Sequence, residues 1–182
     1  MTQGGTRRFP IRYAIQRWND GRWFYGALLV ILVVLIAIKL VARQPIISFI
    51  PVLVLDVGIL IGLWLMRLAS YVEISDQGLR VRSVLRHFEL PYTGISRVRR
   101  QPLEVAFQPA ERRRYVTRFV RRLAREPAAY IRIDRRQDDL VEQAERQLGP
   151  RFVSGGDVVV PILDVDEFVN EVKGRLRGQA GG

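Results

Sequence analysis

Two long apolar runs near the N-terminus constrain this chain more than any other feature of its sequence. The first run covers residues 23–42 with Lys39 as its only charge, and the second covers residues 46–66, interrupted by Ser48 and Asp56. A helix of about 20 apolar residues crosses a hydrocarbon core ~30 Å thick. The remainder of a 182-residue chain is too small to bury two such helices, so we expect both to span a membrane.

The two runs predict an antiparallel helical hairpin that is retained in the mature protein. The first run is longer than the apolar segment of about 7–15 residues in a signal peptide, and no small-residue cleavage site follows it. A short turn near residues 43–45 would link the helices and leave both chain ends on one side. The expected organisation is a basic juxtamembrane segment (1–22), the helical hairpin (23–69) and a C-terminal domain (70–182).

The distribution of positive charge predicts the orientation of the helical hairpin. The chain has 29 Lys and Arg against 18 Asp and Glu, a net charge of +11. The linking turn offers Lys39 and Arg43, whereas arginines flank both other ends of the runs: Arg7, Arg8, Arg12, Arg17 and Arg22 before them, and Arg67, Arg80, Arg82 and Arg86 after them. Because basic residues stay cytoplasmic, we expect both termini inside, in a multi-pass protein of a bacterial inner membrane.

The ends of the chain carry weaker patterns. Phe9, Ile11, Ile15 and Trp18 predict a short interfacial helix that ends at residues 19–21. The first six residues and residues 178–182 are rich in glycine and small polar residues, and we expect them to be unstructured tails.

Polar and small residues inside the second run predict a helix–helix interface. Asp56 would lie deep in the membrane. A carboxyl group there is unfavourable and by default suggests a functional site. Gly58 and Gly62 form a G-x-x-x-G motif that lets another helix approach closely. The alternative is a protonated Asp56 bonded to the backbone or to Ser48, and a pair with Lys39 would require bending of the helices.

The C-terminal domain alternates apolar and polar residues in short segments. Residues 71–75 and 79–85 flank an Asp-Gln-Gly turn and predict a β-hairpin. Further strands are predicted at 88–90, 95–98, 103–107, 130–133 and 158–162. A closing helix at 164–177 would bury Val165, Phe168, Val169, Val172 and Leu176 on one face. This pattern predicts an α+β protein in which a helix plugs a small β-barrel.

The runs YVEISDQGLRV, FELPYTGISRV and VPILDVDEFVNEV resemble the bacterial pleckstrin-homology-like (PH-like) domains, which often follow a pair of transmembrane helices. The resemblance covers residues 71–100 and 157–177. It implies a seven-stranded bent sheet capped by a C-terminal helix, and binding of a lipid or a protein without catalysis. Residues 109–126 and 135–156 depart from the pattern as insertions.

The first insertion predicts a basic amphipathic helix, typical of membrane surfaces and acidic partners. Tyr115, Val116, Phe119, Val120 and Leu123 fall within an arc of ~140°, with arginines opposite. The predicted lipid- or partner-binding residues are Arg112, Arg113, Arg114, Arg118, Arg121, Arg122 and Arg125. The alternatives are an arginine-faced helix packed on the barrel and a nucleic-acid site, which the sparse aromatic residues do not favour. The second insertion predicts a short acidic helix at 138–149.

Composition excludes most catalytic chemistry. The chain has no Cys and only His87, which excludes disulfides, thiol nucleophiles and multi-histidine metal sites. We therefore expect no enzyme, no cofactor and no metal. The leading prediction is a membrane-anchored PH-like binding or scaffold protein that engages anionic lipid headgroups or an acidic protein at the cytoplasmic face. The alternative is an accessory or assembly subunit, or a homo-oligomer, in which Asp56, Gly58 and Gly62 face partner helices.

Overall fold

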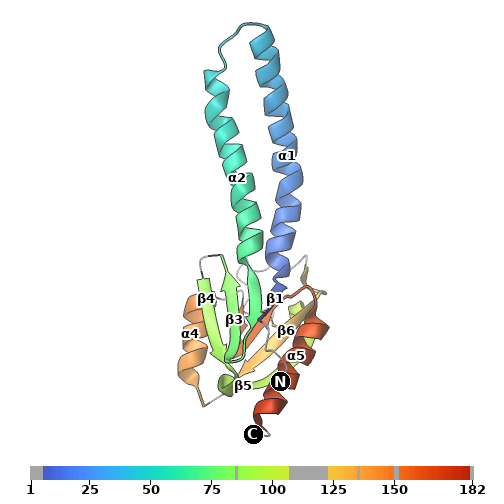
Figure 1. Cartoon of the computed structure of the whole chain (residues 1–182), viewed down its shortest axis with the longest axis vertical. Coiled ribbons are helices and arrows are strands. Elements are labelled where there is room, and N and C mark those ends of the chain that lie inside the picture. Colours follow the sequence, from blue (N-terminus) through green and yellow to red (C-terminus); the bar gives the residue numbers. More distant parts are fainter. Residues whose placement is uncertain (1–5, 85, 107–122, 135, 150–151, 181–182) are drawn as a thin grey trace. The chain divides into compact units, whose positions relative to one another are not determined.

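The chain forms two compact units (Figure 1) in a computed structural model that describes residues 6–84, 86–106, 123–134, 136–149 and 152–180. One unit, Tyr13–Ala69, is the helical hairpin. The other unit, which we call the domain, combines Met1–Arg12 with Ser70–Gly182. The helical hairpin is therefore inserted between two parts of the domain.

The helical hairpin contains α1 (Arg12–Val41) and α2 (Ile50–Ala69), with a short 3₁₀ turn, Ile47–Phe49, before α2. Both helices are long and apolar enough to cross a membrane. Arg43 adopts a positive φ of 55° in the link between them, as a tight turn requires.

Helix α1 is longer than predicted, because it runs without a break through the Asn-Asp-Gly sequence at residues 19–21. The predicted stop at this position is wrong, and Gly21 packs closely against α2 instead. A Cβ atom on Gly21 would lie 2.5 Å from Cδ1 of Leu63 on α2. Glycine at this position lets the two helices approach each other.

The first sheet is antiparallel in the order β1-β2-β3-β4. Its strands are β1 (Arg7–Pro10), β2 (Tyr71–Ile74), β3 (Gly78–Ser83) and β4 (Arg86–Pro91). The predicted pair of strands after the second apolar run is confirmed. The interfacial helix predicted from Phe9 onward is wrong at its start, because Phe9 lies in β1. Its ring is 3 % exposed and packs edge-to-face on Phe168, with 5.3 Å between the ring centroids.

The second sheet is antiparallel in the order β5-β6-β8-β7. Its strands are β5 (Ile95–Pro102), β6 (Pro127–Ile133), β7 (Val153–Ser154) and β8 (Asp157–Val160). The two sheets remain separate, so the single closed barrel predicted from the sequence is not formed. The strand predicted at 103–107 is also wrong, because Leu103–Ala106 form a 3₁₀ turn (η3) that buries Leu103 and Ala106 three residues apart.

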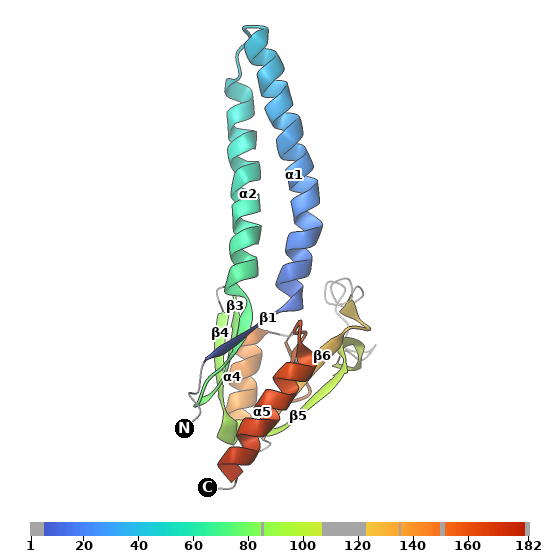
Figure 2. The ribbon, with the colours of Figure 1, turned by 45° about the vertical axis from the view of Figure 1, so that its right-hand side comes forward.

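Two helices complete the domain (Figure 2). The predicted acidic helix is confirmed as α4 (Asp138–Leu148), which packs against β4 and is followed by Gly149 at a φ of 79°. The predicted closing helix is confirmed as α5 (Val165–Ala180), which lies against β5 and β6. Its predicted inner face is buried at Val165, Phe168, Val169 and Val172, whereas Leu176, the last predicted member, is only half-buried.

Candidate functional site

The two chain segments that flank the helical hairpin are bonded to each other inside the domain. Strands β1 and β2 pair along their whole length, from Arg7 opposite Ile74 to Pro10 opposite Tyr71. The next residue extends the contact, because the amide of Ile11 donates to the carbonyl of Ser70 at 3.3 Å. One residue separates β1 from α1, and one separates α2 from β2. Both helices therefore join the domain at the same place without linkers.

Arg12 is the last residue of the domain and the first residue of α1. Its guanidinium pairs with the carboxylate of Glu126 and donates to the carbonyls of Ile162 at 3.1 Å and Leu163 at 3.2 Å. Its amide donates to the carbonyl of Pro161 at 2.8 Å. These bonds fix the start of α1 to the connection between β8 and α5.

The described residues on both sides of the arginine-rich segment are bonded to each other. The amide of Leu103 donates to the carbonyl of Glu126 at 3.0 Å, and the amide of Glu104 donates to that of Ala124 at 2.9 Å. The 3₁₀ turn η3 is thus bonded to the C-terminal end of the predicted insertion, next to the Arg12–Glu126 pair. Leu123, the last residue of the predicted apolar arc, is 8 % exposed.

Most of the predicted binding arginines lie outside the described residues. These are Arg112, Arg113, Arg114, Arg118, Arg121 and Arg122. Arg125 is described, and its side chain is exposed. The structure thus describes only the C-terminal end of the insertion, residues 123–126, and anion binding by its arginines stays a prediction.

Many of the described arginines in the domain are neutralised internally. Asp157 is 6 % exposed and accepts bonds from Arg99 at 3.1 Å and Arg132 at 3.2 Å. Further ion pairs join Arg7 to Glu167, Arg8 to Glu73, Arg80 to Glu89, Arg100 to Asp166 and Arg175 to Asp76. By contrast, the sequence of residues 107–122 contains six Arg and one Glu, which contributes 6 − 1 = +5 to the net charge of +11.

The predicted interface residues of α2 lie on different sides of the helix. Asp56 is 2 % exposed, and neither carboxylate oxygen has a hydrogen-bond partner among the residues that the structure describes. Gly58 is exposed, and a Cβ atom on Gly58 or Gly62 would meet nothing within 4 Å. Asp56 is thus buried, whereas the space beside Gly58 and Gly62 is open.

A pair between Asp56 and Lys39 is excluded by the register of the helices. The contact of Gly21 with Leu63 sets that register. Lys39 lies about 27 Å beyond Gly21 along α1, and Asp56 lies about 10 Å beyond Leu63 along α2, at 1.5 Å per residue. The axial separation of about 16 Å exceeds the reach of a lysine side chain.

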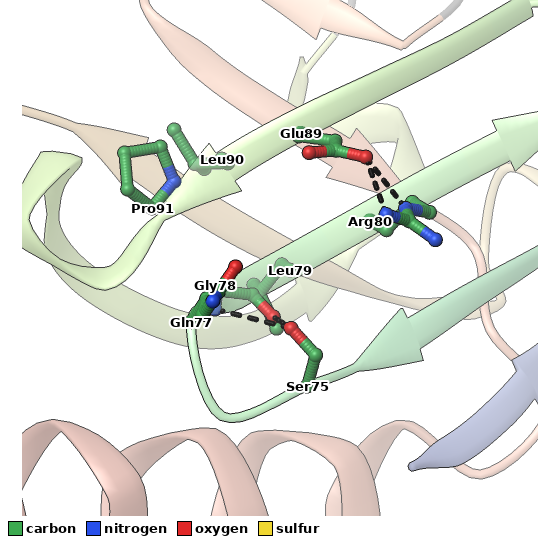
Figure 3. A pocket seen from close by; sticks show the side chains of 8 residues that line it. All are labelled: Ser75, Gln77, Gly78, Leu79, Arg80, Glu89, Leu90 and Pro91. Atoms are coloured by element: carbon green, nitrogen blue, oxygen red, sulfur yellow. Dashed lines mark hydrogen bonds and ion pairs between the residues drawn. The ribbon is translucent and has the colours of Figure 1, made fainter.

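A small cavity of about 170 Å³ lies at the turn between β2 and β3 (Figure 3). Its lining residues are Ser75, Gln77, Gly78, Leu79, Arg80, Glu89, Leu90 and Pro91. The ion pair of Arg80 with Glu89, at 2.6 Å, and the bond from Ser75 Oγ to the carbonyl of Gly78, at 2.9 Å, occupy its polar groups. Within the described ranges, no group of three His, Asp or Glu side chains is placed to hold a metal ion.

No family model, curated protein or solved structure matches this chain. The similarity to PH-like domains therefore stands on the sequence runs alone.

Proposed function

We propose that this chain is a membrane-anchored binding protein. The helical hairpin spans the bacterial inner membrane, and a PH-like domain at the cytoplasmic face engages anionic lipid headgroups, or an acidic protein surface, through the arginine-rich residues 109–126. The observation that carries the proposal is the ion pair between Arg12 and Glu126. It holds the last residue of this insertion beside the first residue of α1.

Electrostatics make this placement effective. A lysine or arginine close to an anionic leaflet contributes about 1 kcal/mol, and the effect decays within the Debye length of about 10 Å. Five arginines on one helix face would therefore bind firmly when they lie at the surface. The membrane anchor adds to this effect, because it holds the insertion at a high local concentration near the headgroups.

A reporter fusion tests the orientation. A reporter that is active only outside the cytoplasm is expected to be active when inserted at Gln44 and silent when fused after Gly182. The expectation follows from the arginines that flank the helical hairpin and from the bond that holds its two ends together. The opposite pattern would place the domain outside and contradict the cytoplasmic assignment.

Lipid selectivity tests the binding function. The full chain is reconstituted in phosphatidylcholine membranes, and electron spin resonance measures how much spin-labelled phosphatidylglycerol or phosphatidylcholine the protein retains. Wild type is expected to retain more phosphatidylglycerol, and added salt should remove the difference. Replacing Arg114, Arg118, Arg121, Arg122 and Arg125 with Gln should also remove it.

A control with the same loss of charge separates a local site from general attraction. It replaces five exposed cations elsewhere in the domain, Arg97, Arg136, Arg146, Lys173 and Arg177, with Gln. This control should keep the preference for phosphatidylglycerol. Equal retention of the two lipids by wild type would contradict lipid binding and favour the acidic protein partner.

An accessory subunit of a larger membrane complex is the second candidate function. It is favoured by the open space beside Gly58 and Gly62, where two small residues one turn apart suit the close approach of another helix. Purification from the native membrane in mild detergent should then yield a stoichiometric complex, and Gly58→Leu should dissociate it. Recovery of the chain alone would leave the anchored binding protein as the better account.

A further inference from the structure

The turn between β3 and β4 lies at the end of the first sheet where the chain leaves the helical hairpin. In the sheet register, Arg82 on β3 lies opposite Tyr71 on β2 and opposite His87 on β4. Tyr71 follows the last residue of α2, Ala69, by two positions, and the β3–β4 turn begins just beyond Arg82. Gln77, in the turn between β2 and β3, lies at the other end of β3, about 20 Å away at ~3.3 Å per residue.

The backbone of this turn is strained at an apolar residue. Val84 adopts a φ of 52°, in the left-handed region. A β-branched side chain is rare there, and such a conformation is energetically unfavourable. Glycine or asparagine would fit the turn without strain. The chain nevertheless carries a valine at this position, which suggests that an apolar side chain is needed there.

Positive charge flanks Val84 without internal neutralisation. Arg82 donates to the hydroxyl of Tyr71 at 3.3 Å, and Arg86 donates to the carbonyl of Leu148 at 3.4 Å. Among the described residues, no carboxylate lies within ion-pair distance of either guanidinium. Arg80, two positions before Arg82 on the same face of β3, is paired with Glu89. The unneutralised arginines of this strand pair are thus the ones at the end nearest to α2.

Chain connectivity keeps the first residue of β2 close to the end of α2. A helix of 20 residues extends about 30 Å, the thickness of the hydrocarbon core. When α2 spans the membrane, Ala69 therefore lies close to the edge of that core. Two further residues of extended chain, about 7 Å, reach Tyr71 and its partner Arg82. That distance matches a headgroup layer about 5–7 Å thick.

We propose that the β3–β4 turn is a second membrane-contact site, in which Val84 enters the headgroup layer and Arg82 and Arg86 bind the phosphates of anionic lipids. The inference rests on the proposed membrane anchoring, but it does not depend on the arginine-rich insertion. Together, the two contacts would hold the domain in one orientation on the bilayer.

Headgroup quenching tests the contact. Because the chain has no cysteine, Val84→Cys and Gln77→Cys each provide one labelling site, at opposite ends of β3. Each variant of the full chain is labelled with an environment-sensitive nitrobenzoxadiazole dye and reconstituted in phosphatidylcholine vesicles containing phosphatidylglycerol. A nitroxide attached to lipid headgroups is expected to quench the dye at position 84 several-fold more than the dye at position 77. Equal quenching at the two positions would overturn the proposal.

Lipid charge provides the second arm of the test. Replacing both Arg82 and Arg86 with Gln should reduce quenching at position 84 to the level seen in vesicles of phosphatidylcholine alone. The matched control Arg80→Gln should leave quenching unchanged, because Arg80 is already paired with Glu89. Quenching that ignores both phosphatidylglycerol and the two arginines would overturn the anionic-lipid role.

The outcomes separate this inference from the proposed function. Resistance to alkaline carbonate extraction reports whether the helical hairpin is inserted. An inserted chain with no excess quenching at position 84 overturns the β3–β4 contact and leaves the anchoring intact. If alkaline carbonate removes the chain from the membrane, the helical hairpin is not inserted, and both proposals are overturned. Loss of lipid selectivity only when residues 114–125 are altered would assign anion binding to the insertion alone.

Discussion

The guanidinium of Arg12 pairs with the carboxylate of Glu126, although 114 positions separate the two residues in the sequence. The pair joins the start of α1 to the end of the arginine-rich insertion. The same residue of α1 also binds the carbonyls of Ile162 and Leu163, just before α5. A single side chain at the base of the helical hairpin thus connects the insertion and the β8–α5 connection.

Removal of Arg12 should destabilise the domain more than removal of Glu126. The ion pair is partly solvated, with side chains 24 % and 44 % exposed, so it is worth at most about 1 kcal/mol. Arg12→Ala also leaves two carbonyls without their donor, and we expect it to lower the free energy of unfolding by about 2 kcal/mol. Glu126→Ala should lower it by less than ~1 kcal/mol. Denaturant unfolding of the domain, with residues 13–69 replaced by a short linker, measures both changes. Equal losses of stability would contradict the idea that Arg12 both pairs with Glu126 and bonds the two carbonyls.

The domain should fold without the helical hairpin if both of its parts are kept. Replacing residues 13–69 with a short glycine–serine linker would join Arg12 to Ser70. A short linker is enough, because the amide of Ile11 donates to the carbonyl of Ser70 and the two ends are therefore close. We expect a soluble protein whose circular dichroism shows strands with a helical minority. Residues 70–182 alone lack β1 and should be less stable by several kcal/mol, because Phe9 and Ile11 are 3 % and 1 % exposed and each contributes about 1.5–3 kcal/mol. Equal stability of the two proteins would contradict the role of β1.

Local patterns predicted the elements whose signals are contained within one segment. Each of these elements shows its periodicity or its capping residue within a short stretch of sequence. They are the apolar runs, the β2–β3 pair, α4 and α5. Strand β1 could not be predicted in this way. It has only four residues, and two of them are arginines. Its partner strand β2 lies more than 60 positions away in the sequence.

The candidate site was only partly predictable for the same reason. The arginine-rich insertion is visible in the sequence, but the pair that roots it beside α1 joins distant residues and has no local signature. Asp56, Gly58 and Gly62 were predicted to share an interface because they lie close together in sequence. Their separation follows from the packing of α2, which buries the carboxyl group and leaves Gly58 exposed. The strain at Val84 depends on a backbone angle that sequence does not encode directly.

Phe168 should be the most sensitive position of α5. It is fully buried, and its ring packs edge-to-face on Phe9. We expect Phe168→Ala to lower the free energy of unfolding by about 3–5 kcal/mol, and Phe168→Asp to prevent folding because it buries an unpaired charge. A double-mutant cycle with Phe9→Leu and Phe168→Leu should give a coupling of about 0.5–1.5 kcal/mol. Additive losses would contradict the ring contact.

Tyr130 should make the domain sensitive to alkali. Burial raises the pKa of Tyr130 to about 12 from an ordinary value of 10, and its hydroxyl donates to the carbonyl of Pro102 at 2.7 Å. Above pH 10 the unfolded chain releases this proton while the folded domain keeps it. The stabilisation is therefore complete below pH 10 and is lost as the pH rises through about 12, by up to roughly 2–3 kcal/mol. Tyr130→Phe should flatten this part of the stability profile, and tyrosinate absorbance should show one fewer late-titrating group.

Asp56 and Gly58 have different surroundings on α2, so we expect their substitutions to have different effects. Its carboxylate oxygens have no partner among the described residues, so Asp56→Leu should remove the cost of burying a polar group, about 1–3 kcal/mol. We expect a higher midpoint when the full chain is unfolded from mild detergent by increasing sodium dodecyl sulfate, with insertion unchanged. Gly58→Leu adds a side chain where nothing lies within 4 Å, so it should leave that midpoint unchanged and affect only the association with another helix, visible as a shift on a native gel. A lower midpoint for Asp56→Leu would mean that Asp56 has a bonding partner that the two helices alone do not supply, and would strengthen the case for a membrane complex.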